Sequence, residues 1–420
     1  MGLSPMMEHY LSMKEKYKDC VLFYRLGDFY EMFFDDAVRV SKLLDLTLTG
    51  RDCGLKERAP MCGIPFHAAD AYIAKLVSMG ERVAICEQLT EPTAGRGMVE
   101  RDVIRVVSAG TVIEENQLDE KKNNYIACAY KGEKGYALAW ADITTGELNA
   151  EEFAGRENVV SALVNLSVAE VICNEAMLFD AKEDVEACRG ALPNFSCYLP
   201  WAFERAAAAK SVCGQLGAAS LDALGLEDKD NAVRAAGALL EYLRETQKHA
   251  LRNMNRLRCL DAGRNMALDA NAVRNLEILR NNAEGKRYGS LLWLLDKTKT
   301  GMGARKLVSM LSSPLCEKTE IEKRLDAVDE LCKGTVMRMG IADMLGGVRD
   351  IERLTGRVSN GNLQPRDCIA LSSSLAAVPN LKFQLIGFSS ELLRGSFARS
   401  RTTESLSCSN SRRVSANVPG

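Results

Sequence analysis

Histidine, tryptophan and any excess of positive charge are what this 420-residue chain has least of. It has three His, three Trp and a net charge of −2, so it does not attract nucleic acid as a whole. A nucleic-acid site would have to be a local concentration of Lys and Arg side chains. The fourteen Cys residues include no Cys-x-x-Cys pair, which argues against a zinc site and a disulfide framework. Free thiols in a reducing cytoplasm are the expectation.

Long apolar runs are also missing. No stretch approaches the roughly 18 apolar residues of a membrane span. Residues 1–10 lack the basic start and the apolar run of a signal peptide. We therefore expect a soluble, cytoplasmic protein.

The chain lacks the usual sequence patterns of catalysis. It contains no Gly-x-x-x-x-Gly-Lys-Ser/Thr phosphate loop, and GKR at 285–287 lacks both the earlier glycine and the hydroxyl residue, which predicts a turn. His9, His67 and His249 stand in no local nucleophile–base pattern. We expect no catalytic residue, no metal and no ATPase activity in this chain.

The composition is globular, with 47% hydrophobic and 26% charged residues, and the length predicts two to three domains. Within residues 1–116, alternating helix and strand patterns predict a small mixed α/β domain. Helices are expected from Pro5, over 35–44 and over 68–79, and strands over 20–26, 29–33, 82–89 and 103–108.

Two further units are predicted beyond a polar linker at 118–124. Residues 117–244 alternate strands and helices and begin with a hairpin over 125–130 and 136–143, joined by KGEKG. From Ala232 strand signals vanish, and helical periodicity predicts an all-α unit over 245–390. From 388 the Ser/Arg-rich sequence predicts a disordered or aberrant tail over 391–420. The helices predicted between Ala232 and residue 390 cover 235–248, 272–281, 290–295, 305–311 and 320–332.

The segment YRLGDFYEMF at 24–33 is the most informative stretch. In an extended chain, residues i and i+2 point to the same side, so Phe29 and Glu31 project together and Tyr30 faces the other way. An aromatic ring and a carboxylate on one edge suit a binding tip. The alternative is that Phe29 is ordinary core and Glu31 a solvated edge residue.

Several blocks of this sequence, in order and at matching spacing, resemble the MutS family of DNA mismatch repair proteins. The likeness implies a multidomain α/β plus all-α fold: a mismatch-recognition domain, a ribonuclease H-like connector and part of a helical core or lever domain. By our comparison it ends near residue 385, which suggests a truncated or frame-shifted product. The blocks are FYRLGDFYEMFFDDA (23–37), APMCGIPFHA (59–68), VAICEQ (83–88), VERDVIRVV (99–107), RNLEIL (274–279) and TGMGARKLVSMLSSPL (300–315).

The resemblance implies a function. Family members bind mispaired or looped duplex, act as homodimers, and signal to a MutL-type partner through an ATP- and Mg²⁺-dependent carboxyl-terminal half that we expect to be missing here. Phe29 is expected to enter the minor groove as a wedge, where a weakly stacked mispair kinks easily. Glu31 is expected to penalise regular duplex through repulsion and to hydrogen-bond a displaced base.

Basic residues near this edge are candidate contacts to DNA phosphates, which position a protein without reading sequence. Each of them could be a solvated surface charge instead; Arg96 and Arg101 are favoured as contacts because their loop resembles that of the family. Met61 could pack beside the wedge or belong to the core. The candidates are Arg51, Lys56 and Arg58 before PMCGIP, and Arg96, Arg101 and Arg105 in and after TAGRGMVERDVIR.

Two rival functions remain open from the sequence. The first is a nuclease built around Asp142, which lies where a ribonuclease H-like unit would place a catalytic carboxylate. Such cleavage needs several convergent acidic ligands for a metal, and the segment does not supply them. The second is a docking role in which the connector binds a repair partner without DNA.

Overall fold

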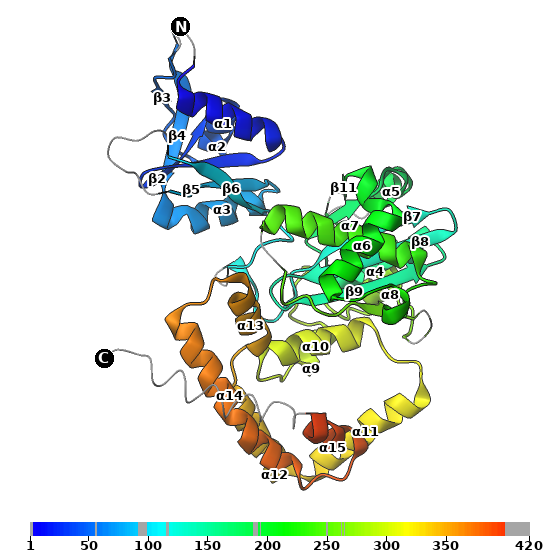
Figure 1. The fold of residues 1–420 in the computed structure, drawn as a ribbon. Helices are drawn as coiled ribbons and strands as arrows, with labels where there is room; N and C mark the ends of the chain where they lie inside the picture. The colour runs from blue at the N-terminus through cyan, green and yellow to red at the C-terminus, as the bar shows by residue number, and fades with distance from the viewer. Residues whose placement is uncertain are drawn as a thin grey trace.

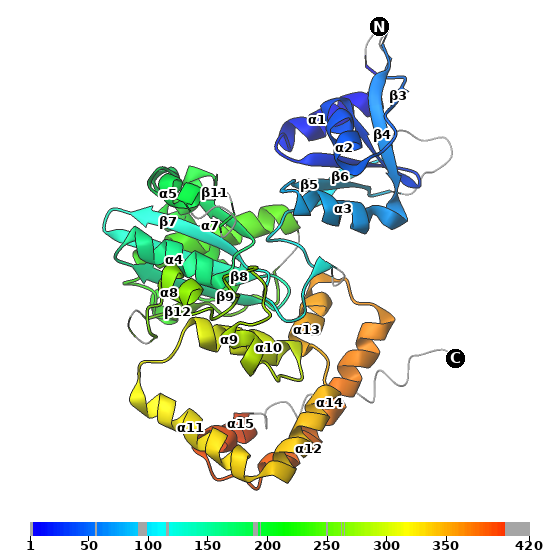
Figure 2. The ribbon, with the colours of Figure 1, turned by 180° about the vertical axis from the view of Figure 1, so that it is seen from behind.

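The computed structural model describes residues 3–54, 57–90, 99–114, 117–187, 192–193, 195–248, 251–261, 263 and 265–399. Three units follow one another along the chain (Figure 1). The two α/β units lie next to each other, and the helices α11, α12, α14 and α15 lie at the end of the molecule far from the first unit (Figures 1 and 2).

The first unit is a six-stranded sheet in the order β3-β4-β2-β1-β5-β6, with helices on both faces. Neighbouring strands are antiparallel except β1 and β5, which are parallel. The strands are β1 (Val21–Leu26), β2 (Phe29–Phe33), β3 (Thr49–Arg51), β4 (Ala59–Pro65), β5 (Val83–Gln88) and β6 (Arg101–Val107). The helices are α1 (Pro5–Lys16), α2 (Phe34–Leu44) and α3 (Ala69–Ser78), with a short 3₁₀ turn, η1 (Phe66–Ala68).

The period-two alternation of the strands divides the core of this unit into two layers. Side chains such as Tyr24 and Phe33 pack with Tyr10 of α1 on one face. Side chains such as Phe23 and Met32 pack with α2 and α3 on the other face. Phe29 and Glu31 belong to the α1 face by register, and Tyr30 belongs to the opposite face, as the alternation predicts.

The second unit has the strand order β11-β10-β7-β8-β9-β12. An antiparallel meander, β7-β8-β9, is flanked by strands that run parallel to its outer members, and helices cover both faces, as in ribonuclease H-like folds. The strands are β7 (Ile126–Gly132), β8 (Gly135–Asp142), β9 (Glu147–Phe153), β10 (Glu170–Cys173), β11 (Phe195–Cys197) and β12 (Arg258–Leu260). The helices are α4 (Arg156–Leu166), α5 (Glu175–Ala187), α6 (Arg205–Leu216) and α7 (Asp230–Gln247), with the 3₁₀ turns η3 (Pro200–Phe203) and η4 (Asp222–Leu224).

The third unit is helical and open. Several of its helices expose large apolar side chains, such as Val336 at 85% and Phe383 at 74%. Its helices are α8 (Ala270–Asn275), α9 (Leu291–Leu295), α10 (Gly301–Ser312), α11 (Lys318–Lys333), α12 (Thr335–Gly346), α13 (Ile351–Asn360), α14 (Pro365–Leu385) and α15 (Glu391–Arg399). Among the described residues, no helix is long and apolar enough to cross a membrane.

Four sequence-based predictions differ from this structure. The boundary at 244 falls inside α7, which continues to Gln247 because Thr246 and Gln247 are buried. Strand β12 lies beyond Ala232 and pairs with β9, a long-range contact that local periodicity does not reveal. The helix expected over 272–281 ends at Asn275. The tail prediction is wrong for Glu391–Arg399, which forms α15 against α11; residues 400–420 lie outside the described residues.

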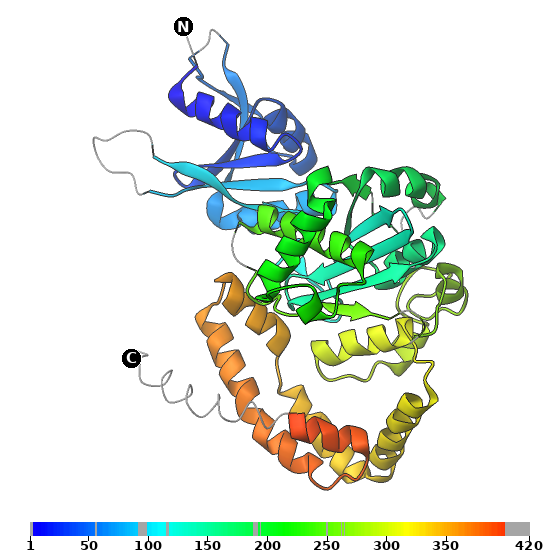
Figure 3. The ribbon, with the colours of Figure 1, turned by 45° about the vertical axis from the view of Figure 1, so that its right-hand side comes forward.

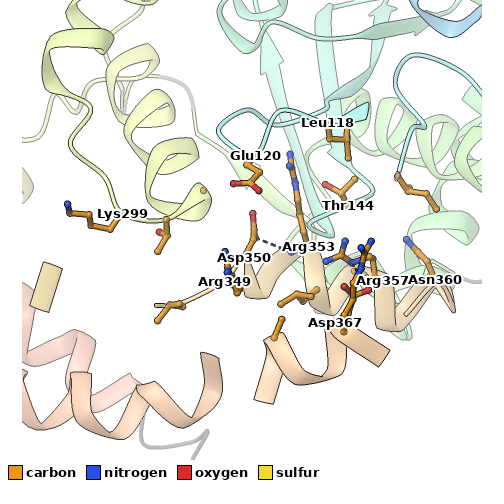
Figure 4. A pocket seen from close by; sticks show the side chains of 18 of the residues that line it. Leu118, Glu120, Thr144, Lys299, Arg349, Asp350, Arg353, Arg357, Asn360 and Asp367 are labelled. Carbon is orange, nitrogen blue, oxygen red and sulfur yellow. Dashed lines mark hydrogen bonds and ion pairs between the residues drawn. The ribbon is translucent and has the colours of Figure 1, made fainter. Parts of the chain in front are cut away.

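The linker between the first two units is held by the third unit. Arg353 donates to the carbonyl oxygens of Asp119 and Lys122 at 3.1 and 2.6 Å, and Arg305 donates to that of Glu120 at 3.0 Å. Lys121 pairs with Asp296 at 3.2 Å. Figure 4 shows Arg353 rising from α13 toward the linker, beside a cavity of about 370 Å³ at this junction.

The first two units also share a polar contact. Glu170 of β10 accepts hydrogen bonds from the hydroxyl of Ser108, from the amide of Gly110 at 3.0 Å and from the hydroxyl of Tyr242. The guanidinium of Arg82 lies over the Tyr242 ring at 5.6 Å. These contacts join the residues just before β5 and just after β6 to β10 and α7 of the second unit, which lies beside the first in Figure 3.

Candidate nucleic-acid interface

Phe29 lies at the tip of the hairpin between β1 and β2. Gly27 supplies the turn with a left-handed φ of 58°, and Leu26 and Phe29 close the ladder. The ring of Phe29 is 48% exposed, whereas Phe33 on the same face of the same strand is 1% exposed. Phe29 therefore is not part of the core, and the core alternative does not hold for it.

Phe66 forms a second exposed aromatic surface beside this tip. Its backbone amide donates to the carbonyl oxygen of Asp28 at 2.9 Å, and Pro65 lies opposite Phe29 in the ladder. The guanidinium of Arg25 lies 3.7 Å from the centroid of the Phe66 ring, a cation–π geometry. No sequence pattern assigned a role to Phe66 or Arg25. The only sequence signal was the position of Phe66 directly after a strand that ends in proline.

Glu87 holds Arg25 and Tyr30 next to the tip. It pairs with Arg25 at 3.3 Å and accepts a hydrogen bond from the hydroxyl of Tyr30. Burial, followed by the bond to Glu87, raises the pKa of Tyr30 well above its usual value, so its proton stays on. Tyr30 and Arg25 thus brace the strand whose other face carries Phe29.

Glu31 is paired rather than free. Its carboxylate forms an ion pair with Arg51 of β3, and β4 lies between the two strands. The side chain of Glu31 is 15% exposed and that of Arg51 is 39% exposed. Gly63 lies opposite Glu31 on β4, and a Cβ built there would lie 3.5 Å from Cγ of Glu31. The structure therefore joins a predicted selector and a predicted phosphate contact.

The remaining predicted cations divide into three groups. Arg58 is exposed, and none of the ion pairs found within the described residues involves it. Lys56 and Arg96 lie outside the described residues. Arg101 and Arg105 are engaged within the domain, which argues against the predicted phosphate contacts.

Arg101 is 9% exposed, donates to the carbonyl oxygens of Arg25 and Val99 at 2.9 and 3.0 Å, and lies over the Tyr24 ring. Arg105 pairs with Glu114 at 2.6 Å and donates to the carbonyl oxygen of Thr111 at 2.8 Å. A guanidinium with several internal partners at short distance is expensive to withdraw. Sequence could not separate Arg101 from Arg58, because both stand next to charged residues, and the partners of Arg105 are not visible in its own apolar stretch.

Met61 does not lie beside the wedge. It pairs with Phe33 at the far end of β2 and packs against the core layer under α1. The four residues from Met61 to Pro65 span about 13 Å of strand. Of the two alternatives for Met61, the structure favours the core.

The carboxylate of Asp142 is buried and hydrogen-bonded to neighbouring residues, as a structural residue would be. It is fully buried and accepts hydrogen bonds from Asn123 and from the amide of Asn124 at 3.1 Å, and from the amide and hydroxyl of Thr144 at 2.9 and 2.6 Å. Within the described residues, no three His, Cys, Asp or Glu side chains come together as a metal could require. These bonds occupy a carboxylate that a nuclease would need for its metal.

The fold and the tip together define a multidomain protein that exposes an aromatic ring at a hairpin tip. Models of known protein families match its sequence. The model for MutS domain I matches residues 4–116, that for domain II matches 124–255 and that for domain III matches 271–415. The third match extends past residue 385, where our comparison by motif ended.

Curated relatives match nearly the whole chain. The DNA mismatch repair protein MutS of Lachnoclostridium phytofermentans is 42% identical over 393 residues, which cover 93% of this chain and 42% of that protein. The DNA mismatch repair protein MutS of Caldanaerobacter subterraneus is 43% identical over 397 residues, which cover 94% of this chain and 45% of that protein. The chain thus spans less than half the length of these relatives. It belongs to the MutS family and carries its domains I, II and III.

Proposed function

We propose that this chain recognises mispaired or looped bases in duplex DNA, with Phe29 as a minor-groove wedge. The single observation that carries the proposal is the half-exposed ring at the hairpin tip, on a sheet face whose other aromatic rings, Tyr24 and Phe33, are buried. Exposure of an aromatic ring at a tight turn is costly for folding and useful for binding. Membership of the MutS family supports duplex DNA as the ligand.

The chemistry of the tip fits this role. An apolar side chain inserted from the minor groove partly unstacks one base step and kinks the duplex, and a mispaired step yields at lower cost. Stacking of a base on an aromatic ring contributes about 1–3 kcal/mol. Phe66 is a second partly exposed aromatic ring next to the tip. Of the predicted phosphate contacts that the structure describes, Arg58 is the exposed one outside any ion pair found there.

Glu31 supplies the selection in this proposal. A carboxylate near a polyanion weakens binding to regular duplex, whereas a displaced base can offer it an N–H donor. The wedge therefore opens the step and the carboxylate reads whether a donor becomes available.

The whole family's partners and energy source enter as part of the proposal. We propose that domain II docks a MutL-type partner and that this chain, having no phosphate loop in its sequence, hydrolyses no ATP. ATP, Mg²⁺ and homodimer formation then belong to the part of the longer relatives that this chain does not match. Turnover of ATP by the purified chain would contradict this assignment, and capture of the partner by domain II without DNA would favour the docking role alone.

The test is competition between duplexes with and without one mispair. Phe29→Ala is expected to lower the preference for the mispaired duplex about tenfold, which corresponds to about 1.4 kcal/mol of lost stacking. Phe179→Ala, which removes a ring that is 85% exposed on α5, is the matched control and should leave the preference unchanged. An equal loss of affinity for both duplexes would mean that Phe29 only supports the fold.

A further inference from the structure

The ion pair between Glu31 and Arg51 has a consequence for discrimination. Before DNA binds, the carboxylate and the guanidinium neutralise each other across β4. One nitrogen of the Arg51 guanidinium, Nη1, is taken by Glu31, and Glu31 does not present a bare charge. Moving the whole guanidinium to a phosphate would break this ion pair unless Glu31 gains another partner.

A mispaired step offers both new partners. A base displaced by the wedge can donate an N–H to Glu31, and the released guanidinium can then turn to a phosphate, whose oxygens suit its donor geometry. An intact duplex offers only the phosphate. Moving Arg51 there would leave Glu31 unpaired beside a polyanion with 15% of its side chain exposed to water, which is unfavourable.

We propose that Arg51 is a specificity-determining residue whose phosphate contact forms only on mispaired duplex, because Glu31 holds the guanidinium until a displaced base takes its place. The proposal rests on the proposed function. It corrects the sequence-based expectation that Arg51 is a general backbone contact.

The position of the pair supports an exchange rather than a fixed structural bridge. Arg51 is the last residue of the edge strand β3, which has three residues and pairs with β4 alone. Its side chain is 39% exposed, in contrast to the buried Arg101. In β4, Arg51 lies opposite Ala59 and Glu31 lies opposite Gly63, so the two side chains reach each other along the strand. The exposed guanidinium at the end of β3 is therefore not part of the core.

Salt dependence counts the phosphate contacts and so tests the exchange directly. Each phosphate contact contributes about 0.9 to the slope of log affinity against log salt on duplex DNA. In the chain that retains Glu31, Arg51→Gln is expected to reduce the slope by about 0.9 on the mispaired duplex and to leave the slope on the matched duplex unchanged. Arg58→Gln is the control, and any reduction that it causes should be equal on both duplexes.

Glu31→Gln provides the second arm. It cannot hold Arg51 by charge, so the arginine should reach the phosphate on either duplex, and adding Arg51→Gln in that background should reduce both slopes equally. If Arg51→Gln reduces the salt slope equally on both duplexes in the chain that retains Glu31, the proposal is overturned. It is also overturned if the substitution reduces the slope on neither duplex. If the original chain shows no preference for a mispair, the proposed function fails instead, and the two failures are distinguishable.

Discussion

Phe29 and Phe33 begin and end the same strand and point to the same face, yet only one of them meets water. Phe33 is held by Tyr10 of α1 in an edge-to-face contact at 5.0 Å between ring centroids. Phe29 stands outside this core layer, next to the turn at Gly27. Position relative to α1, rather than residue type, therefore decides which ring is core and which is free to bind.

At the same scale, Glu31→Gln is expected to strengthen binding to matched duplex about threefold to tenfold. The change removes a negative charge near the polyanion and frees Arg51 for a phosphate, and either effect is of the order of 1 kcal/mol. Equilibrium titration of matched duplex at fixed salt measures the change. Glu57→Gln removes an exposed charge from the same domain as a control; an equal gain there would mean that net charge alone is responsible.

At the scale of helices and strands, the contact between α6 and α7 depends on small residues. In α7, a Cβ added to Gly237 would lie 2.4 Å from Cα of Ala208 in α6, so these two helices touch through their backbones. In α6, Gly214 has no atom within 4 Å of the corresponding position. The two glycines therefore differ in packing while sharing the same helical conformation.

Gly237→Ala is expected to destabilise the chain by about 1–3 kcal/mol, because the two helices must separate to admit the methyl group. Gly214→Ala should instead stabilise it by about 0.5–1 kcal/mol through helix propensity. Denaturant unfolding followed by circular dichroism compares the two. Similar effects of both substitutions would contradict the close packing of α6 and α7.

Across the whole molecule, the segment from Asp119 to Lys122 links all three units. It joins the first unit to the second along the chain, and Arg305, Arg353 and Asp296 of the third unit hold it. Arg305 also pairs with Asp350 and Glu352, and its side chain is 4% exposed. The third unit therefore contacts the short backbone segment that joins the first two units.

Arg305→Met is expected to cost about 3–5 kcal/mol, because it leaves Asp350 without its buried partner. Limited proteolysis should then cut within 117–122 faster, since the linker loses one of its anchors. Arg349→Met, an exposed residue at the rim of the same cavity, is the control and should leave the cleavage rate unchanged. Equal rates of cleavage within 117–122 in the two variants would contradict the idea that Arg305 holds the linker.

Acid should loosen the same junction. Burial raises the pKa of Asp350, but the hydrogen bonds and charge of Arg305 outweigh it and hold the pKa below its usual value. Because the folded-state pKa is depressed, the stabilisation is present above the unfolded value of about 3.9 and is lost as pH falls through the folded value. Asp350→Asn should therefore flatten the loss of stability below about pH 4, and an unchanged acid profile would count against the pair.

Local sequence predicted the parts of this protein that depend on local rules. The alternation in 29–33 placed Phe29 and Glu31 on one face, and helix start signals together with amphipathic spacing located α1, α2 and α3. Local sequence could not predict the ion pair between Glu31 and Arg51, the distance of Met61 from Phe29, or the internal hydrogen bonds of Arg101, because these depend on contacts between distant strands. Strand β12 and the contacts of the third unit with the linker were not predicted for the same reason.

The most direct measurement of the central claim is the bend of the DNA. Fluorescence energy transfer between dyes at the two ends of a short duplex reports the kink that a wedge produces. We expect the unmodified chain to raise the energy transfer on a duplex with one mispair and not on a matched duplex. The Phe29→Ala variant, when bound, should leave the energy transfer of both duplexes unchanged. Undiminished bending by bound Phe29→Ala, or the same bend in matched duplex, would contradict the account.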